Sequence, residues 1–138
     1  MTAPSMKPTE RPEFALGLRL HNGGEYYEAH EAWEDIWRDE EIDEYRLFVQ
    51  GLIQVTSAFH KLTFQKAPGG ASRLLARGLE KLEPYPADYL GVDLAPFREG
   101  AKRCVPIFAE YERDPSGMAS FDRALIPSLR MLATPPQG

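Results

Sequence analysis

A histidine and a glutamate stand four residues apart within the aromatic segment EYYEAHEAWEDIW, which covers residues 25–37. On a helix each residue advances about 100°, so His30 and Glu34 lie one turn apart, where their side chains can touch. A histidine with a carboxylate partner can serve as a general base or as a pair of metal ligands. The spacing therefore indicates His30 and Glu34 as the candidate catalytic pair.

The aromatic residues of this helix lie on the same side as the pair. Tyr26, Trp33 and Trp37 fall within about 60° of His30, and Glu34 falls about 40° to the other side. Three other carboxylates lie on the opposite face and should meet water: Glu28, Glu31 and Asp35. The pattern predicts that the pair points inward, and that Trp37→Ala costs about 3–5 kcal/mol, as for an emptied buried aromatic position.

A second polar stripe is expected on the next helix, where Gln50 and Gln54 share one face and Gly51 leaves room beside them. The short turn RDEEID makes the two helices antiparallel neighbours. That geometry sets Glu34 level with Gln50 and His30 level with Gln54. Each unpaired buried polar group costs about 1–3 kcal/mol, so the sequence predicts a paired His/Glu/Gln cluster between the helices.

The candidate ligand-binding residues lie on these two helices: Tyr26, Trp37, Gln50, Gln54 and His60. His60 is expected roughly 12 Å along the helix axis from His30, too far for the two rings to share one metal ion. HEAWE also departs from the zinc motif H-E-x-x-H, and amides are poor zinc ligands. We therefore predict no metal site, and the sequence identifies no cofactor.

Helical periodicity continues through most of the chain, which predicts an all-α fold: a compact bundle of about five helices with a central antiparallel helix pair. Glycine- and proline-containing turns such as HNGG, KAPGG and PYPADYLGVD separate the helices. Asp43 and Asp93 are candidate helix caps, and Pro106 should kink or divide the fifth helix. Residues 116–133 are compatible with a short helix followed by an extended segment that packs across the bundle. The helices are expected at about 13–21, 25–38, 44–65, 71–83 and from residue 94 onward.

Length and composition indicate one domain, at residues 13–133, in a chain of 138 residues. Residues 1–12 are expected to form a disordered or loosely packed arm, and residues 134–138 a flexible tail. The sequence has neither an apolar run of about 20 residues nor a secretion signal, and its single cysteine, Cys104, fits a reducing cytoplasm. The net charge of −5 argues against a nucleic-acid partner. The partner remains unknown, no membrane association is expected, and formation of a homo-oligomer is left open.

Four segments occur in the order found in a known family: NGGEYYEAHEAWEDIW, FVQGLIQVTSAFHKL, GGASRLLARGLEKLE and YLGVDL. Over residues 14–112 the chain resembles the bacterial and archaeal domain-of-unknown-function 309 family. The resemblance implies a compact all-helical domain and carries no established activity. It also implies that several residues occupy the family's signature positions: His30, Glu34, Trp37, Gln50, Gly51, Gln54 and His60.

Three hypotheses for the polar cluster follow. It can be a small-molecule-binding or catalytic site built on His30 and Glu34. It can be a purely structural network that fixes how two helices align. The chain can also be a helical-hairpin scaffold for protein interaction, in which case an exposed groove lined by aromatic residues is expected. A polar pocket open to solvent between the second and third helices would favour the first hypothesis.

Overall fold

Five α-helices account for most of residues 6–133, the part of the chain that the computed structural model describes. The all-α prediction is confirmed. Four short 3-10 helices lie before, between and after them: Pro8–Glu10, Tyr89–Gly91, Pro115–Ser120 and Arg123–Leu125. The α-helices are α1 (Pro12–Asn22), α2 (Tyr26–Asp39), α3 (Asp43–Thr63), α4 (Pro68–Leu82) and α5 (Leu94–Arg113).

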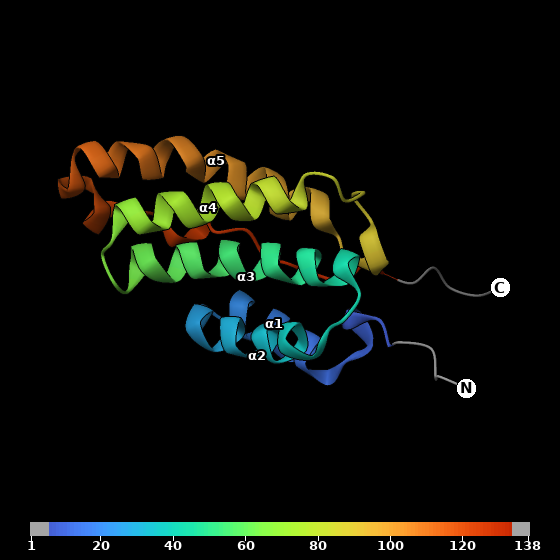
Figure 1. The fold of residues 1–138 in the computed structure, drawn as a ribbon. Coiled ribbons are helices and arrows are strands. Elements are labelled where there is room, and N and C mark those ends of the chain that lie inside the picture. The colour runs from blue at the N-terminus through green and yellow to red at the C-terminus, as the bar shows by residue number, and fades with distance from the viewer. Residues whose placement is uncertain (1–5, 134–138) are drawn as a thin grey trace, which may run out of the picture.

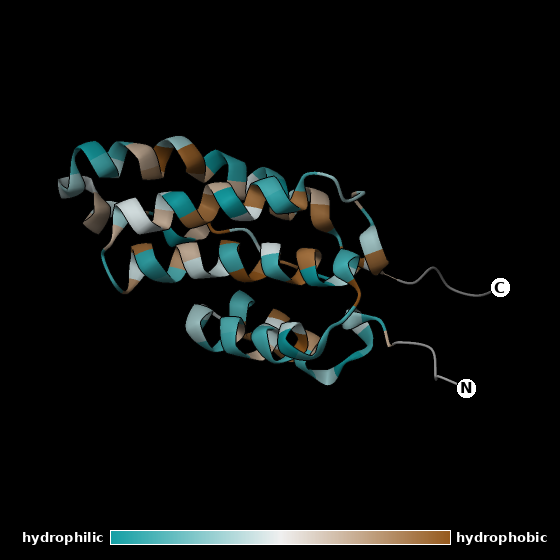
Figure 2. Ribbon diagram, in the orientation of Figure 1, coloured by the Kyte–Doolittle hydropathy of each residue, from teal (hydrophilic) through white to brown (hydrophobic). Residues whose placement is uncertain are grey.

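Helix α3 lies at the centre of the bundle, with α2 against one side and α4 against the other (Figure 1). Helix α1 packs on α2, and α5 packs on α4, so the order in space follows the order in the chain. Hydrophobic and hydrophilic residues alternate along each helix (Figure 2), as expected when one face of a helix is buried and the other is hydrated. None of the helices in the described residues is long and apolar enough to cross a membrane.

Two glycines, one on α3 and one on α4, let the backbones of these helices come into close contact. A Cβ added at Gly78 would lie 2.6 Å from Cγ2 of Val55 and 2.9 Å from the carbonyl oxygen of Gly51. A Cβ added at Gly51 would lie 2.8 Å from the Leu82 side chain. The predicted close approach at Gly51 is present, but the helix that approaches is α4. The most extensive contact of α3 is therefore with α4, not with α2.

Three local predictions about the helices have different outcomes, and the first, that Asp43 caps α3, is wrong. Asp43 is the first residue of α3, and the N-cap position belongs to Ile42. Instead, the Glu40 carboxylate accepts hydrogen bonds from the backbone N–H groups of Glu41 and Ile42 in the turn. Asp93 occupies the N-cap position of α5 but makes no capping hydrogen bond with its side chain. Pro106 does not divide α5, which is a single helix anchored by buried residues on both sides of the proline.

The residues after α5 form two 3-10 helices and then an extended segment, residues 126–133, which meets the loop before α5 at an isolated antiparallel bridge between Val92 and Met131. The sequence is compatible with a short helix followed by an extended segment at residues 116–133. The extended segment is present, and two short 3-10 helices precede it. At the other end of the chain, Pro8 is buried within its 3-10 helix. Residues 1–5 of the predicted arm and the predicted tail at 134–138 lie outside the described residues.

The turn between α3 and α4 contains a strained residue that offers a test of the fold. Lys66 is exposed and has a φ of 54°, a left-handed conformation that costs non-glycine residues about 1 kcal/mol. We expect Lys66→Gly to raise the free energy of unfolding by about 0.5–1 kcal/mol in urea denaturation. Lys61→Gly, inside α3, is the control and should lower it by about 1 kcal/mol. A loss in both variants would contradict the backbone conformation at residue 66.

Candidate functional site

A continuous row of side chains crosses from the end of α3 to the end of α2. On the α3 side, the rings of Phe64 and His60 stack with their centroids 5.4 Å apart. The Tyr27 ring on α2 bridges the two histidines, with its centroid 5.5 Å from that of His60 and 5.8 Å from that of His30. From His30 the row continues along α2. We call this set the α2–α3 row: Phe64, His60, Tyr27, His30, Glu34 and Arg38.

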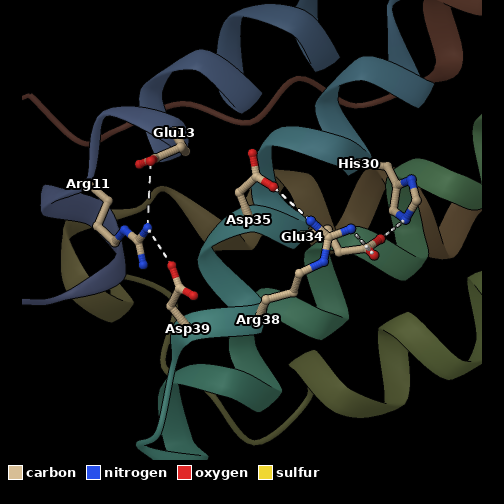
Figure 3. A network of polar contacts seen from close by, with 7 residues as sticks. All are labelled: Arg11, Glu13, His30, Glu34, Asp35, Arg38 and Asp39. Carbon is tan, nitrogen blue, oxygen red and sulfur yellow. Dashed lines mark hydrogen bonds and ion pairs between the residues drawn. The ribbon is translucent and has the colours of Figure 1, made fainter.

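The predicted contact between His30 and Glu34 is present (Figure 3). Nε2 of His30 lies 2.6 Å from Oε2 of Glu34, and Nη2 of Arg38 donates to Oε1 of the same carboxylate at 2.9 Å. The side chains of His30 and Glu34 are 27% and 29% exposed, so water screens part of their interaction. Because Glu34 binds Nε2 of His30, Nδ1 is the ring nitrogen that takes no part in this ion pair.

The prediction of an inward-facing His/Glu/Gln cluster is wrong in two respects. Neither His30 nor Glu34 is buried, and both partners of Glu34 lie on α2 itself. Gln54 turns toward α4, where its Oε1 accepts a hydrogen bond from Nζ of Lys81 at 3.0 Å. Gln50 makes no side-chain hydrogen bond with any residue of 6–133. The helical period correctly placed these residues on their own faces, but it could not tell which neighbouring helix covers each face.

A solvent-open depression of about 210 Å³ lies where α2 begins and α3 ends. It exists because Gly24, with a φ of 84°, reverses the chain between α1 and α2 and brings the first turn of α2 beside His60. Two of its aromatic residues are well exposed, Tyr27 at 47% and Phe64 at 55%. Nδ1 of His60 is buried without a hydrogen-bond partner. The depression is lined by Gly24, Glu25, Tyr26, Tyr27, Glu28, His60 and Phe64.

The structure separates the predicted ligand-binding residues. Tyr26 and His60 line the depression, whereas Gln50 and Gln54 do not. Trp37 is half-buried beneath Arg46, whose guanidinium carbon lies 4.1 Å from the centre of the Trp37 ring. Tyr27 was missed because it falls outside the apolar stripe of α2. Its signal was its position in the first turn of α2, where a neighbouring helix does not cover every face.

The segment that carries the α2–α3 row matches a family model. The family described as Domain of unknown function (DUF309) matches residues 14–74, from α1 into α4. This match agrees with the resemblance to the DUF309 family that the sequence motifs indicated. The whole α2–α3 row lies within the DUF309 match, whereas the resemblance noted at residues 75–112 extends beyond it. A comparison with curated proteins found no match.

The DUF309 segment also contains a buried histidine that the sequence analysis did not single out. Nδ1 of His21 lies 2.9 Å from the hydroxyl of Thr56, and Nε2 lies 2.8 Å from the carbonyl oxygen of Pro127. A carbonyl only accepts, so Nε2 carries the proton and Nδ1 accepts from the Thr56 hydroxyl. Burial lowers the pKa of His21, and the hydrogen bond to Pro127 opposes that shift. The i, i+4, i+7 spacing of Phe14, Leu18 and His21 was the available signal.

His21 is one half of a clamp that holds the extended C-terminal segment. The neighbouring Asn22 donates from Nδ2 to the carbonyl oxygen of Leu129 and accepts from its N–H through Oδ1, both at 2.9 Å. His21 and Asn22 therefore fasten residues 127–129 to the end of α1. This role is structural, and it lies apart from the α2–α3 row. Among residues 6–133, no group of three or more His, Cys, Asp or Glu side chains is arranged to hold a metal ion.

The exposure of Glu34 leads to a stability prediction. We expect Glu34→Gln to lower the free energy of unfolding by less than about 1 kcal/mol, because partly exposed ion pairs contribute little. Chemical denaturation at pH 7 of the parent and the variant measures the difference. Arg38→Gln, which removes the cationic partner of Glu34, should lower the free energy of unfolding by a similarly small amount. A loss above about 2 kcal/mol would mean that the fold depends on the Glu34 carboxylate.

Proposed function

We propose that the DUF309 domain of this chain is a binding module whose depression between α2 and α3 accepts an organic cation. The carrying observation is the lining of that depression, where three rings, those of Tyr27, His60 and Phe64, meet two carboxylates, Glu25 and Glu28. Aromatic faces attract ammonium and guanidinium groups through the ring quadrupole, at about 0.5–1 kcal/mol for exposed sites. A nearby carboxylate adds a second attraction of similar size.

The distribution of charge along α2 supports this proposal. Near the end of α2, Arg38 pairs with Glu34 and Asp35, and Arg11 pairs with Asp39 (Figure 3). Near its start, the carboxylates of Glu25, Glu28 and Glu31 form no ion pair with any described residue. The unpaired negative charge is thus concentrated beside the aromatic depression. The guanidinium of Arg123 lies 5.2 Å from the centre of the Phe64 ring but forms no ion pair with these three carboxylates, so a bound cation would supply the charge partner that they lack among the described residues.

The geometry gives less support to a purely structural role. A network that aligns two helices must bond across them, but Glu34 binds only residues of α2. The contacts of the row that cross from α2 to α3 are between rings, and the residue Tyr27 remains 47% exposed. Exposed aromatic surface is a common feature of recognition surfaces.

The proposal is tested with benzyltrimethylammonium and butylammonium, the second of which reproduces the end of a lysine side chain. Each is titrated into the ¹⁵N-labelled protein while amide shifts are followed. We expect saturable shifts centred on residues 24–28, His60 and Phe64. Benzyl alcohol, which has a similar ring without the charge, should produce weaker shifts. Shifts spread evenly over the protein would contradict the proposal.

A matched pair of variants separates local recognition from total charge. Glu28→Gln and Glu31→Gln each remove one negative charge from the exposed face of α2, but only Glu28 lines the depression. Glu28→Gln should weaken cation binding about fivefold, equivalent to roughly 1 kcal/mol, whereas Glu31→Gln should have a smaller effect. Equal effects would show that the probes respond only to the net charge of the protein.

A second candidate function, proton transfer by His30, has its own supporting observation. The 2.6 Å contact with Glu34 orients the imidazole and leaves Nδ1 as the nitrogen that can accept a proton. Divalent metals and common metabolites are screened by thermal melting against the parent and Glu34→Gln. A ligand that raises the melting temperature of the parent alone would support this candidate. If no ligand shifts the parent, proton transfer by His30 is abandoned.

A further inference from the structure

A second concavity, of about 370 Å³, lies between α5 and the residues that follow it, in the C-terminal part of the chain. We call it the α5 groove. Its apolar lining includes Pro96 and Ile107 of α5 together with Ile126 of the extended segment. It shares no residue with the depression between α2 and α3. It also lies outside the DUF309 match, which ends at residue 74.

Both walls of the α5 groove are held in place. A Cβ added at Gly100 would lie 2.6 Å from Cβ of Pro127, so the extended segment touches α5 where that helix has no side chain. The carbonyl oxygen of Pro127 accepts from His21, and the N–H of Asp93 donates to the carbonyl oxygen of Arg130 at 2.8 Å. The groove is thus largely formed before any ligand enters, as in most small-molecule sites.

Two arginines line the α5 groove, and both have unused hydrogen-bonding capacity. The side chains of Arg103 and Arg130 form no ion pair or hydrogen bond with residues 6–133. By contrast, Arg46 and Arg98 donate to backbone carbonyls, and Arg38 pairs with carboxylates. The one acidic residue of the lining is Asp93, so the groove has a surplus of positive charge in a chain whose net charge is −5.

The groove also contains Cys104, whose thiol is unsuited to nucleophilic chemistry. The side chain is buried, and burial raises the pKa of the thiol to about 11. The thiol therefore stays protonated at neutral pH, with Sγ 3.9 Å from the carbonyl oxygen of Leu125. Cys104 contributes to the wall as a small apolar residue, which favours reversible binding in the groove over covalent chemistry.

We propose that the α5 groove binds a small organic anion with an apolar body, such as a carboxylate, sulfonate or phosphate ester. The acidic group would pair with Arg103 and Arg130, since guanidinium groups match the planar geometry of oxyanions. The apolar body would lie against Pro96, Ile107 and Ile126. This proposal stands on the lining of the α5 groove alone and does not depend on cation binding between α2 and α3.

The test uses 8-anilinonaphthalene-1-sulfonate, which combines a sulfonate with an apolar body and fluoresces when bound. Titration of the ¹⁵N-labelled protein should give saturable amide shifts at α5 and at residues 124–130. Octanoate should displace the probe, whereas octylammonium and octanol should not. If octanol displaces the probe as effectively as octanoate does, the site binds only the apolar part of a ligand, and the proposal is overturned.

Arginine variants test the two cationic residues directly. Arg103→Gln and Arg130→Gln should each weaken binding of the sulfonate probe about tenfold, as for the loss of one charge-assisted hydrogen bond. The control is Arg77→Gln on α4, an exposed arginine that lies outside the groove, and it should bind the probe as the parent does. Unchanged affinity in both groove variants, or probe-induced shifts located away from the groove, would overturn the proposal.

Discussion

Replacing Trp33 by alanine is expected to lower the free energy of unfolding by about 3–5 kcal/mol, among the largest effects of any single substitution in this chain. Trp33 is completely buried, and its Nε1 donates to the carbonyl oxygen of Phe14 at 3.2 Å. A Cβ added at Gly17 would lie 2.1 Å from that same nitrogen, so α1 packs directly onto the ring. Alanine would leave a cavity at the contact between α1 and α2 and would remove the hydrogen bond from the indole to the Phe14 carbonyl.

Trp37→Ala provides the matched comparison. The sequence pattern predicted a loss of about 3–5 kcal/mol at this position, but Trp37 is only half-buried and lies under the Arg46 side chain. We expect its removal to cost about 1–2 kcal/mol, in proportion to the smaller area taken from water. Urea denaturation of both variants measures the difference. A greater loss for Trp37→Ala than for Trp33→Ala would contradict the packing of α1 on α2.

The positions of the helices could be predicted from sequence because their boundaries are local. Glycine- and proline-containing turns near Gly24 and Pro68 separate segments with a clear helical period, and the structure places helix ends within a few residues of those expected. The neighbour of each helical face is not local information. Gln54 of α3 was expected to face α2. Its side chain instead bonds Lys81 on α4, because Gly51 and Gly78 bring α3 and α4 together.

The candidate site was predictable in part for the same reason. The i, i+4 contact of His30 with Glu34 depends only on helix geometry, and it is present. The depression depends on how the start of α2 meets the end of α3, and the sequence pattern carries no measure of that distance. His60 and Tyr26 were named from their residue types and positions. Tyr27, the ring that joins His60 to His30, had only its place in the first turn of α2 as a signal, and its two ring contacts depend on the packing of both helices.

The extended segment illustrates the limit most clearly. Its main anchors, His21 with Pro127 and Asn22 with Leu129, join residues more than 100 positions apart in the chain. Segments without a helical period show no amphipathic face from which such contacts could be inferred. The α5 groove exists only because this segment lies along α5, so the groove was not foreseeable from sequence.

His21 gives the protein a pH dependence that can be measured. Burial lowers the pKa of His21 below its ordinary value of 6.5 in the folded protein. Below pH 6.5 the unfolded chain therefore takes up a proton that the folded protein does not, and this difference favours unfolding. Stability from this group should be fully present above pH 6.5. It should fall as the pH drops toward the folded-state pKa, with a slope of up to about 1.4 kcal/mol per pH unit.

His21→Gln tests this dependence because an amide can still donate to Pro127 and accept from Thr56 but does not titrate. We expect the variant to lose about 2–3 kcal/mol at pH 7, through weaker packing against Trp33 and Phe97, and to lose the slope assigned to His21. Urea denaturation at pH 5, 6, 7 and 8 measures both effects. Asn22→Gln, which alters the other half of the clamp without changing a titratable group, is the control and should keep the slope of the parent. If His21→Gln retains the parent slope between pH 5 and 6.5, the acid sensitivity arises from other groups, and the imidazole is not the neutral, buried link that its contacts with Thr56 and Pro127 indicate.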